Sequence, residues 1–138
     1  MIKQVIVVRK DLHMRMGKIA AQVAHASMKV LLDRSFRYFT PKSKSGEVKT
    51  LHYQLSMTKD EPLYEWLEGK FTKIVVYCNM ESELKEVEVQ CHYNQIPYAT
   101  ITDFGLTEFH GKLTDTCVAV GPWYSDEIDK ITGDFKLL

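Results

Sequence analysis

The sequence has few of the features that build disulfide, metal or membrane-spanning structures. Its three cysteines, at positions 78, 91 and 117, are odd in number and form no C-x-x-C pair. A disulfide framework or a structural zinc site is therefore not indicated. No run of 18 apolar residues is present, as a transmembrane helix requires. We expect no metal, no cofactor and no membrane association.

The common catalytic motifs are also missing. The chain has no G-x-S-x-G, H-E-x-x-H, Walker A or G-x-G-x-x-G pattern. Its five histidines show no metal-ligand spacing. These absences remove the sequence signals for a serine nucleophile, a zinc protease, a P-loop and a dinucleotide site.

What is present is typical of a globular protein. The 138 residues are 45% hydrophobic and 26% charged, which predicts one domain over residues 1–138 with a real core. The N-terminus shows no signal-peptide pattern, so we expect a cytoplasmic protein.

A net charge of zero conceals a strong asymmetry. Residues 1–50 contain eleven Lys and Arg against three Asp and Glu, whereas residues 51–138 contain seven against fifteen. The basic half is suited to a polyanion such as nucleic acid. The alternative is that the two halves neutralise each other across the fold.

A helix is predicted from residue 17 or 18 to about residue 37, ending before Thr40-Pro41. Lys18, Gln22, His25 and Lys29 share one narrow face of it. The other faces are small or apolar, so we expect the helix to be packed on most sides. The polar face is either a functional site or simply the side exposed to water. For His25 we expect a packed, hydrogen-bonded side chain.

The remaining pattern alternates between strands and helices. Buried strands are predicted at residues 2–8, 71–78, 98–102 and 116–120, and helices after Pro62 and at residues 82–93 and 126–131. An insert near residues 40–60 contains an alternating segment at 49–57, which suggests a short edge strand or hairpin. This order predicts an α/β fold with three layers, α/β/α.

Polar residues gather around the third predicted strand. Asp103 follows its carboxyl end, where catalytic groups are common in α/β sheets. A base, a cation, an amide and hydroxyls could meet there, from Asp103, Lys18, Gln22, Thr107, Thr114 and Thr116. Taken singly, Asp103 is better explained as a turn residue before Gly105, and Thr116 by strand propensity.

Several separated blocks together resemble one known family. They are VIVVRKDL followed by GKIAAQVAHA at 17–26, then KIVV at 73–76, Ile96-Pro97, ITDFGLT at 101–107, VAVGP at 118–122, IDKITG at 128–133 and KLL at 136–138. This combination is similar to the archaeal and eukaryotic type (type II) of peptidyl-tRNA hydrolases. The resemblance spans the chain except for roughly residues 38–62.

The resemblance implies a four-stranded mixed sheet, with the last strand antiparallel, between helical layers. It also implies hydrolysis of the ester between a peptide and the 3′ ribose of tRNA, which recycles the tRNA. The family's functional residues match Lys18, Gln22, Asp103 and Thr107, and a further threonine best matches Thr116.

Three departures from the family pattern stand out. Leu106 replaces a usual arginine, the loop at 111–116 is one residue longer, and the insert near 40–60 exceeds the usual linker. Because of the longer loop, either Thr114 or Thr116 could supply the hydroxyl.

We assign roles to the candidate residues on this basis. Lys18, Asp103, Thr107 and Thr116 are predicted to be catalytic: Asp103 orients or deprotonates water and Lys18 stabilises negative charge. Substrate binding is predicted for Gln22, Arg15, Lys10, His110, Lys112 and Thr114, and structural roles for His25, Gly105 and Gly121. The expected partner is peptidyl-tRNA, and monomer and homodimer both stay open. The alternatives are a non-catalytic tRNA-binding or protein-interaction module and a D-aminoacyl-tRNA editing hydrolase.

Overall fold

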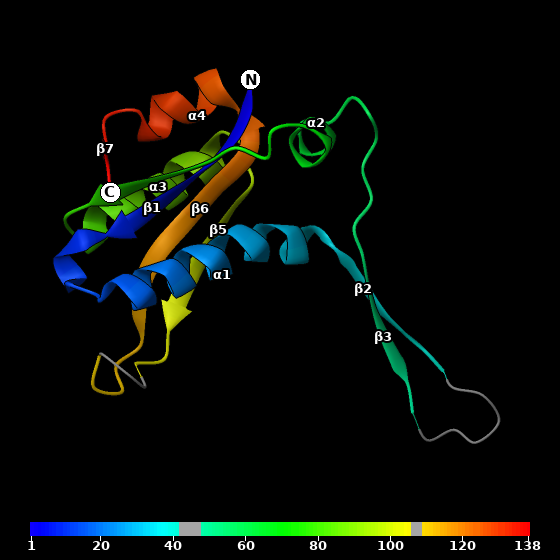
Figure 1. Ribbon diagram of the computed structural model, residues 1–138, viewed down its shortest axis with the longest axis horizontal. Helices are drawn as coiled ribbons and strands as arrows, with labels where there is room; N and C mark the ends of the chain where they lie inside the picture. Colours follow the sequence, from blue (N-terminus) through cyan, green and yellow to red (C-terminus); the bar gives the residue numbers. More distant parts are fainter. Residues whose placement is uncertain (42–47, 106–108) are drawn as a thin grey trace.

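The computed structural model describes residues 1–41, 48–105 and 109–138. Its main sheet has five strands in the order β5-β6-β1-β4-β7 (Figure 1). At its centre, β1 (Ile2–Arg9) pairs in parallel with β4 (Lys73–Cys78). The antiparallel strand β6 (Thr114–Tyr124) lies between β1 and β5 (Tyr98–Asp103). A short β7 (Lys136–Leu137) adds to the free edge of β4.

The α/β class and the mixed sheet are confirmed, but the predicted number of four strands is wrong. The fifth strand, β7, is only two residues long, too short to leave a periodic pattern in the sequence. The antiparallel direction of the fourth predicted strand, β6, is confirmed. This strand begins earlier than expected, so Thr114 and Thr116 both lie within it.

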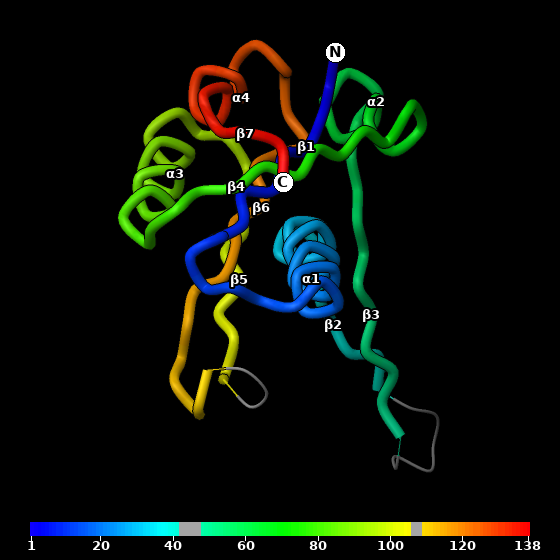
Figure 2. The backbone as a smooth tube through the Cα atoms, turned by 60° about the vertical axis from the view of Figure 1, so that its left-hand side comes forward, coloured from blue at the N-terminus to red at the C-terminus, as the bar shows by residue number. Residues whose placement is uncertain are grey.

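Helices cover both faces of the sheet, as Figure 2 shows. On one side lie α1 (Met16–Arg34) and α2 (Pro62–Glu68), and on the other lie α3 (Glu81–Tyr93) and α4 (Ser125–Thr132). A single 3₁₀ turn (Lys10–Leu12) connects β1 to α1. Because β1 and β6 are apolar on both faces, each face buries its own cluster of side chains. The central strands therefore form a rigid base for the segments at their ends.

The helix α1 differs from its prediction in length and in packing. It ends at Arg34, and the Ser35 hydroxyl donates a 2.8 Å hydrogen bond to the Leu31 carbonyl. The expectation of packing on most sides is wrong, since only the stripe with Gln22, Ala26 and Val30 is buried. The opposite side of the helix is open to solvent.

The chain between α1 and α2 forms a hairpin separate from the main sheet. Strand β2 (Phe36–Thr40) pairs antiparallel with β3 (Thr50–Gln54), and its first two residues are those predicted to end the helix. The strand predicted within residues 49–57 is confirmed over residues 50–54. The aromatic and β-branched residues of FRYFT favour an extended strand over a further turn of helix.

The three cysteines are free and buried. Among the residues that the structure describes, no helix is both long enough and apolar enough to cross a membrane.

Candidate active site

The carboxyl end of β5 meets the first turns of α1. Asp103 is the last residue of β5, and its Oδ2 lies 2.5 Å from the Nζ of Lys18. The two side chains are 13% and 15% exposed, respectively. The predicted carboxylate and cation are therefore brought together across 85 residues of sequence, and both remain partly exposed.

Gln22 connects this ion pair to the core. Its side chain is 3% exposed, and its Nε2 lies 3.4 Å from Asp103 Oδ2, while its Oε1 accepts a 2.6 Å hydrogen bond from the Thr116 hydroxyl. Lys18 and Gln22 are four residues apart on one face of α1, so both reach the same carboxylate. The amide has little freedom to turn because both of its ends are engaged.

A β-bulge explains why Thr116 points toward α1. Ile101 pairs with Cys117 and Thr102 pairs with Asp115, which leaves Thr116 as the extra residue in β6. The bulge allows Thr116 and Cys117 to contact Gln22 together, through its amide side chain and its backbone carbonyl. Thr116 is fully buried, so it acts behind the ion pair and not at its surface.

Thr114 occupies the more accessible of the two threonine positions. It is the direct cross-strand partner of Asp103, which places the two side chains on the same face of the sheet. Thr114 is half-buried, and its hydroxyl donates to the Lys112 carbonyl at 3.0 Å. Thr107, the other predicted hydroxyl, and Leu106 lie outside the described residues.

Two glycines have backbone conformations that other residues rarely adopt. Gly105 has φ +76°, and a Cβ there would lie 2.6 Å from the backbone N and O of Lys112. Its N–H donates a 2.7 Å hydrogen bond to Asp103 Oδ1. Gly121, in β6, has φ +86° and would place a Cβ 2.8 Å from the Lys3 carbonyl oxygen. Both positions require glycine, and Gly105 also helps to fix the carboxylate.

The surroundings of Asp103 favour its ionised form. The Lys18 ammonium holds the pKa of that carboxyl below its usual range, partial burial opposes this, and the Gly105 N–H adds to the lowering. His25 also contributes electrostatically to the lowered pKa of Asp103. The expectation that His25 is packed is wrong: it is exposed, because the sheet contacts the neighbouring stripe of α1. Its structural role stays a prediction.

An open cavity of about 430 Å³ shares Phe109 and Thr114 with the surroundings of the ion pair, but neither Lys18 nor Asp103 lines it, and it extends to Thr102 and Asp115 on the opposite face of the sheet. Three predicted substrate-binding residues line it: His110, Lys112 and Thr114. The other two basic residues predicted to bind substrate, Lys10 and Arg15, are not among the described residues that line this cavity. Lys10 lies over the ring of Tyr77, 4.3 Å from its centre, and Arg15 is exposed directly before α1.

The sequence analysis missed two parts of this region. Phe109 lies beneath Lys18, with Nζ 5.6 Å from the ring centre. On the opposite face of the sheet, Asp115 accepts hydrogen bonds from Lys85 and, at 2.6 Å, from Thr102. These partners lower the pKa of Asp115 despite its burial. The alternation of strand residues could have indicated that Asp115 faces away from Asp103.

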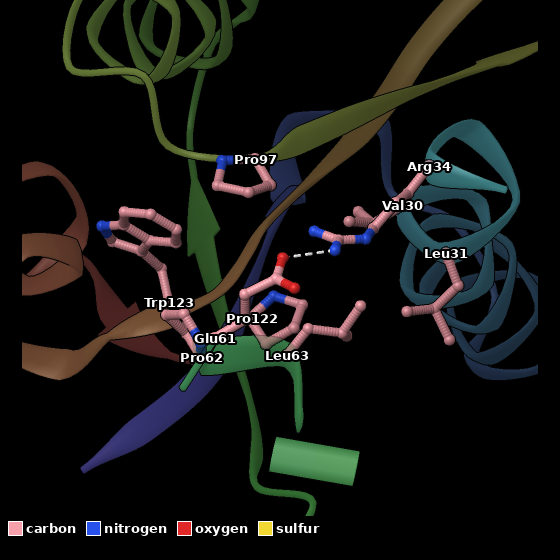
Figure 3. A pocket seen from close by; sticks show the side chains of 9 residues that line it. All are labelled: Val30, Leu31, Arg34, Glu61, Pro62, Leu63, Pro97, Pro122 and Trp123. Carbon is pink, nitrogen blue, oxygen red and sulfur yellow. Dashed lines mark hydrogen bonds and ion pairs between the residues drawn. The ribbon is translucent and has the colours of Figure 1, made fainter. Parts of the chain in front are cut away.

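A second cavity, of about 290 Å³, lies at the other end of α1 (Figure 3). Its wall is mostly apolar, and the ionisable side chains that line it, Arg34 and Glu61, are paired with each other. None of the predicted site residues lines it. Within the described ranges, no group of three His, Cys, Asp or Glu is placed to hold a metal ion.

Comparison with known proteins identifies the family of the chain. Residues 2–138 match the model of the family described as peptidyl-tRNA hydrolase PTH2. The chain belongs to this family. It is 38% identical to a peptidyl-tRNA hydrolase of Methanopyrus kandleri, over all of this chain and 99% of the relative. It is 40% identical to one of Sulfurisphaera tokodaii, over 99% of this chain and 98% of the relative.

A solved structure resembles the fold. It is a protein of unknown function from Agrobacterium tumefaciens, with a TM-score of 0.54, 12% identity, and coverage of 99% of this chain and 96% of that one. At this identity the likeness concerns the fold alone.

Proposed function

We propose that this PTH2 family member hydrolyses the ester that joins a peptide to the 3′ ribose of tRNA, and that the Lys18–Asp103 pair is its active site. The observation that carries the proposal is the 2.5 Å contact between Nζ and the carboxylate of two partly exposed side chains, at the carboxyl end of β5. Family membership supports the reaction class.

Water is the nucleophile in this proposal. The Cys117 thiol contacts Gln22, but it is fully buried and burial raises its pKa to about 12, so it is not a thiolate near neutral pH. Asp103 is ionised and partly exposed, so it can orient a water molecule toward the ester carbonyl and accept a proton from it.

Lys18 supports the charge changes of the reaction. As the water oxygen bonds to the carbonyl carbon, negative charge develops on the carbonyl oxygen, and the ammonium beside Asp103 stabilises it. The bond from that carbon to the ribose oxygen then breaks, and the proton held by Asp103 moves to the ribose oxygen. The products are a peptide acid and a free 3′ end.

The surrounding residues take positioning and binding roles. Thr116 holds Gln22, which in turn orients the carboxylate through the contacts described above. The accessible hydroxyl of Thr114 contacts the water or the ester. Lys112, which lines the cavity, and Arg15, which is exposed directly before α1, bind phosphates in a salt-dependent way.

We also propose that residues 1–138 are one domain and that the protein works in the cytoplasm.

The test is turnover of an N-acetyl-aminoacyl-tRNA by the purified protein. Lys18→Ala and Asp103→Asn should each lower kcat by at least about 100-fold, as expected for loss of an electrostatic or acid–base group. Two exposed residues of α4 provide matched controls, Lys130→Ala and Asp126→Asn, which should retain wild-type activity. Full activity of both site variants would show that the site is elsewhere.

Substrate choice separates the remaining alternatives. Wild-type protein that binds tRNA without hydrolysing it is a non-catalytic module. Wild-type protein that hydrolyses only D-aminoacyl-tRNA is an editing enzyme.

A further inference from the structure

The hairpin of β2 and β3 exposes an unusual number of aromatic rings. We call its described strands, residues 36–40 and 50–54, the ribbon. Phe36, Phe39 and Tyr53 are 68%, 60% and 49% exposed, and Tyr38 is 37% exposed. Figure 1 shows the ribbon extending away from the main sheet. Its rings therefore serve no core.

One face of the ribbon is a set of stacked rings. Tyr38 and His52 are cross-strand partners whose planes are 6° apart, with centres 4.6 Å apart. Phe36 stacks on Tyr38 with ring centres 5.7 Å apart. Thr40 completes this face with a 3.1 Å hydrogen bond to His52 Nε2. Flat rings bordered by hydrogen-bonding groups match the platforms on which nucleic-acid bases stack.

The other face combines a ring with a cation. Arg37 lies over Tyr53, with its guanidinium carbon 5.1 Å from the ring centre. A guanidinium placed over a ring in this way can also bind a phosphate or stack on a base. Both faces of the ribbon thus carry groups suited to RNA.

The charge of the region favours RNA over a protein partner. Residues 36–59 contain five Lys and Arg against one acidic residue, in a chain whose totals are eighteen of each sign. The two strands of the ribbon contain Arg37 and no Asp or Glu. Four of these five cations are lysines, which are depleted in protein interfaces but suited to a phosphate backbone.

The ribbon also lies where a long substrate would reach. It begins two residues after α1, and Lys18 and Arg34 are separated by about 24 Å along the helix. In Figure 2 the ribbon and the ends of β5 and β6 extend to the same side of the molecule, with α1 between them. A substrate whose ester lies at Lys18 and which also touches the ribbon must span the length of α1, as a tRNA body can.

We propose that the ribbon is an RNA-binding arm that stacks on unpaired bases of the tRNA body, away from the ester. The proposal rests on the proposed function for the identity of the RNA. The arm contributes to substrate affinity and not to the chemical step. Its loss should therefore raise KM and leave kcat unchanged.

The experiment compares two substrates with ribbon variants. Tyr38→Ala and Tyr53→Ala are assayed on full-length N-acetyl-aminoacyl-tRNA and on the same ester carried by a 3′-terminal trinucleotide. We expect KM for the full-length substrate to rise about tenfold, as for loss of one base-stacking contact, with kcat within about twofold. Turnover of the trinucleotide should be unchanged, which also shows that the variants are folded.

Two controls sharpen the result. Tyr93 is the last residue of α3 and is 83% exposed. Tyr93→Ala should leave KM unchanged for both substrates. Tyr38→Phe should restore near wild-type KM, because stacking needs the ring and not the hydroxyl.

A direct measurement of tRNA binding tests the arm independently of hydrolysis. If wild-type protein hydrolyses neither substrate, the proposed function fails. The arm is then tested by fluorescence anisotropy with deacylated tRNA. A loss of tRNA affinity of about tenfold in the ribbon variants would support it. Unchanged KM and unchanged binding in both ribbon variants would overturn the arm. A change of oligomeric state in these variants, with tRNA affinity retained, would overturn it in favour of an interface between copies.

Discussion

Replacement of Thr116 by valine separates a positioning role from a contact role. Valine has nearly the shape of threonine, so the packing around the bulge in β6 is retained. What disappears is the 2.6 Å hydrogen bond to Gln22 Oε1. Gln22 is 3% exposed, and its oxygen would be left in a buried site without this donor.

The cost follows from that unpaired oxygen. Leaving a buried acceptor unsatisfied costs about 1–3 kcal/mol in free energy of unfolding. For a chain of this size, each kcal/mol lowers Tm by about 3 °C, so we expect Tm to fall by about 3–9 °C. The kcat should also fall, because Gln22 is then free to turn away from Asp103, while KM stays near the wild-type value.

Thr114→Val is the matched comparison. Thr114 is half-buried, and among the described residues its hydroxyl bonds only the Lys112 carbonyl. Thr114→Val should therefore lower the free energy of unfolding by no more than about 0.5 kcal/mol. If this hydroxyl contacts the water or the ester, kcat falls about tenfold or more. Thermal unfolding by circular dichroism and steady-state turnover measure both effects. A Thr116→Val protein with wild-type Tm and very low kcat, beside a fully active Thr114→Val protein, would refute the assignment.

Two further predictions concern Asp103 and its loop. Because Lys18 lowers the pKa of Asp103 in the folded protein, the stability from this carboxylate is present above the ordinary carboxyl pKa of about 4 and is lost as pH falls through the lowered value. The difference in free energy of unfolding between wild type and Lys18→Ala should therefore narrow below about pH 4 in urea titrations, and a constant difference would argue against the ion pair. Gly105→Ala should lower kcat at least about tenfold, since an L-residue at this positive φ displaces the N–H that holds Asp103; unchanged turnover would mean that the loop is not needed to fix the carboxylate.

The sequence predicted the central part of the fold because the signals there are strong. The β-branched segments at β1 and β4, and the periodicity of α1 and α3, locate these elements within a few residues. The hairpin was only partly foreseen, since Phe36–Thr40 follows a long helix without a proline or glycine to mark the boundary. The two residues of β7 form a strand only because the edge of β4 is available to pair with them.

For the candidate site, residue types were easier to predict than their arrangement. Helical spacing placed Lys18 and Gln22 together, and the end of a buried strand placed Asp103. The difference between Thr114 and Thr116 depends on a bulge that sequence periodicity does not reveal. His25 shares the polar stripe of α1, but the sheet contacts the next stripe, so tertiary packing decided which side was buried.

The central claim is that Lys18 and Asp103 hydrolyse the ester of peptidyl-tRNA. Single-turnover hydrolysis of N-acetyl-aminoacyl-tRNA, with enzyme in excess, measures the chemical step directly. Rapid hydrolysis by the wild type and by Lys130→Ala, with at least about 100-fold slower reaction in Lys18→Ala and Asp103→Asn, is the predicted result. Equal rates in all four proteins, or no hydrolysis by the wild type, would contradict it.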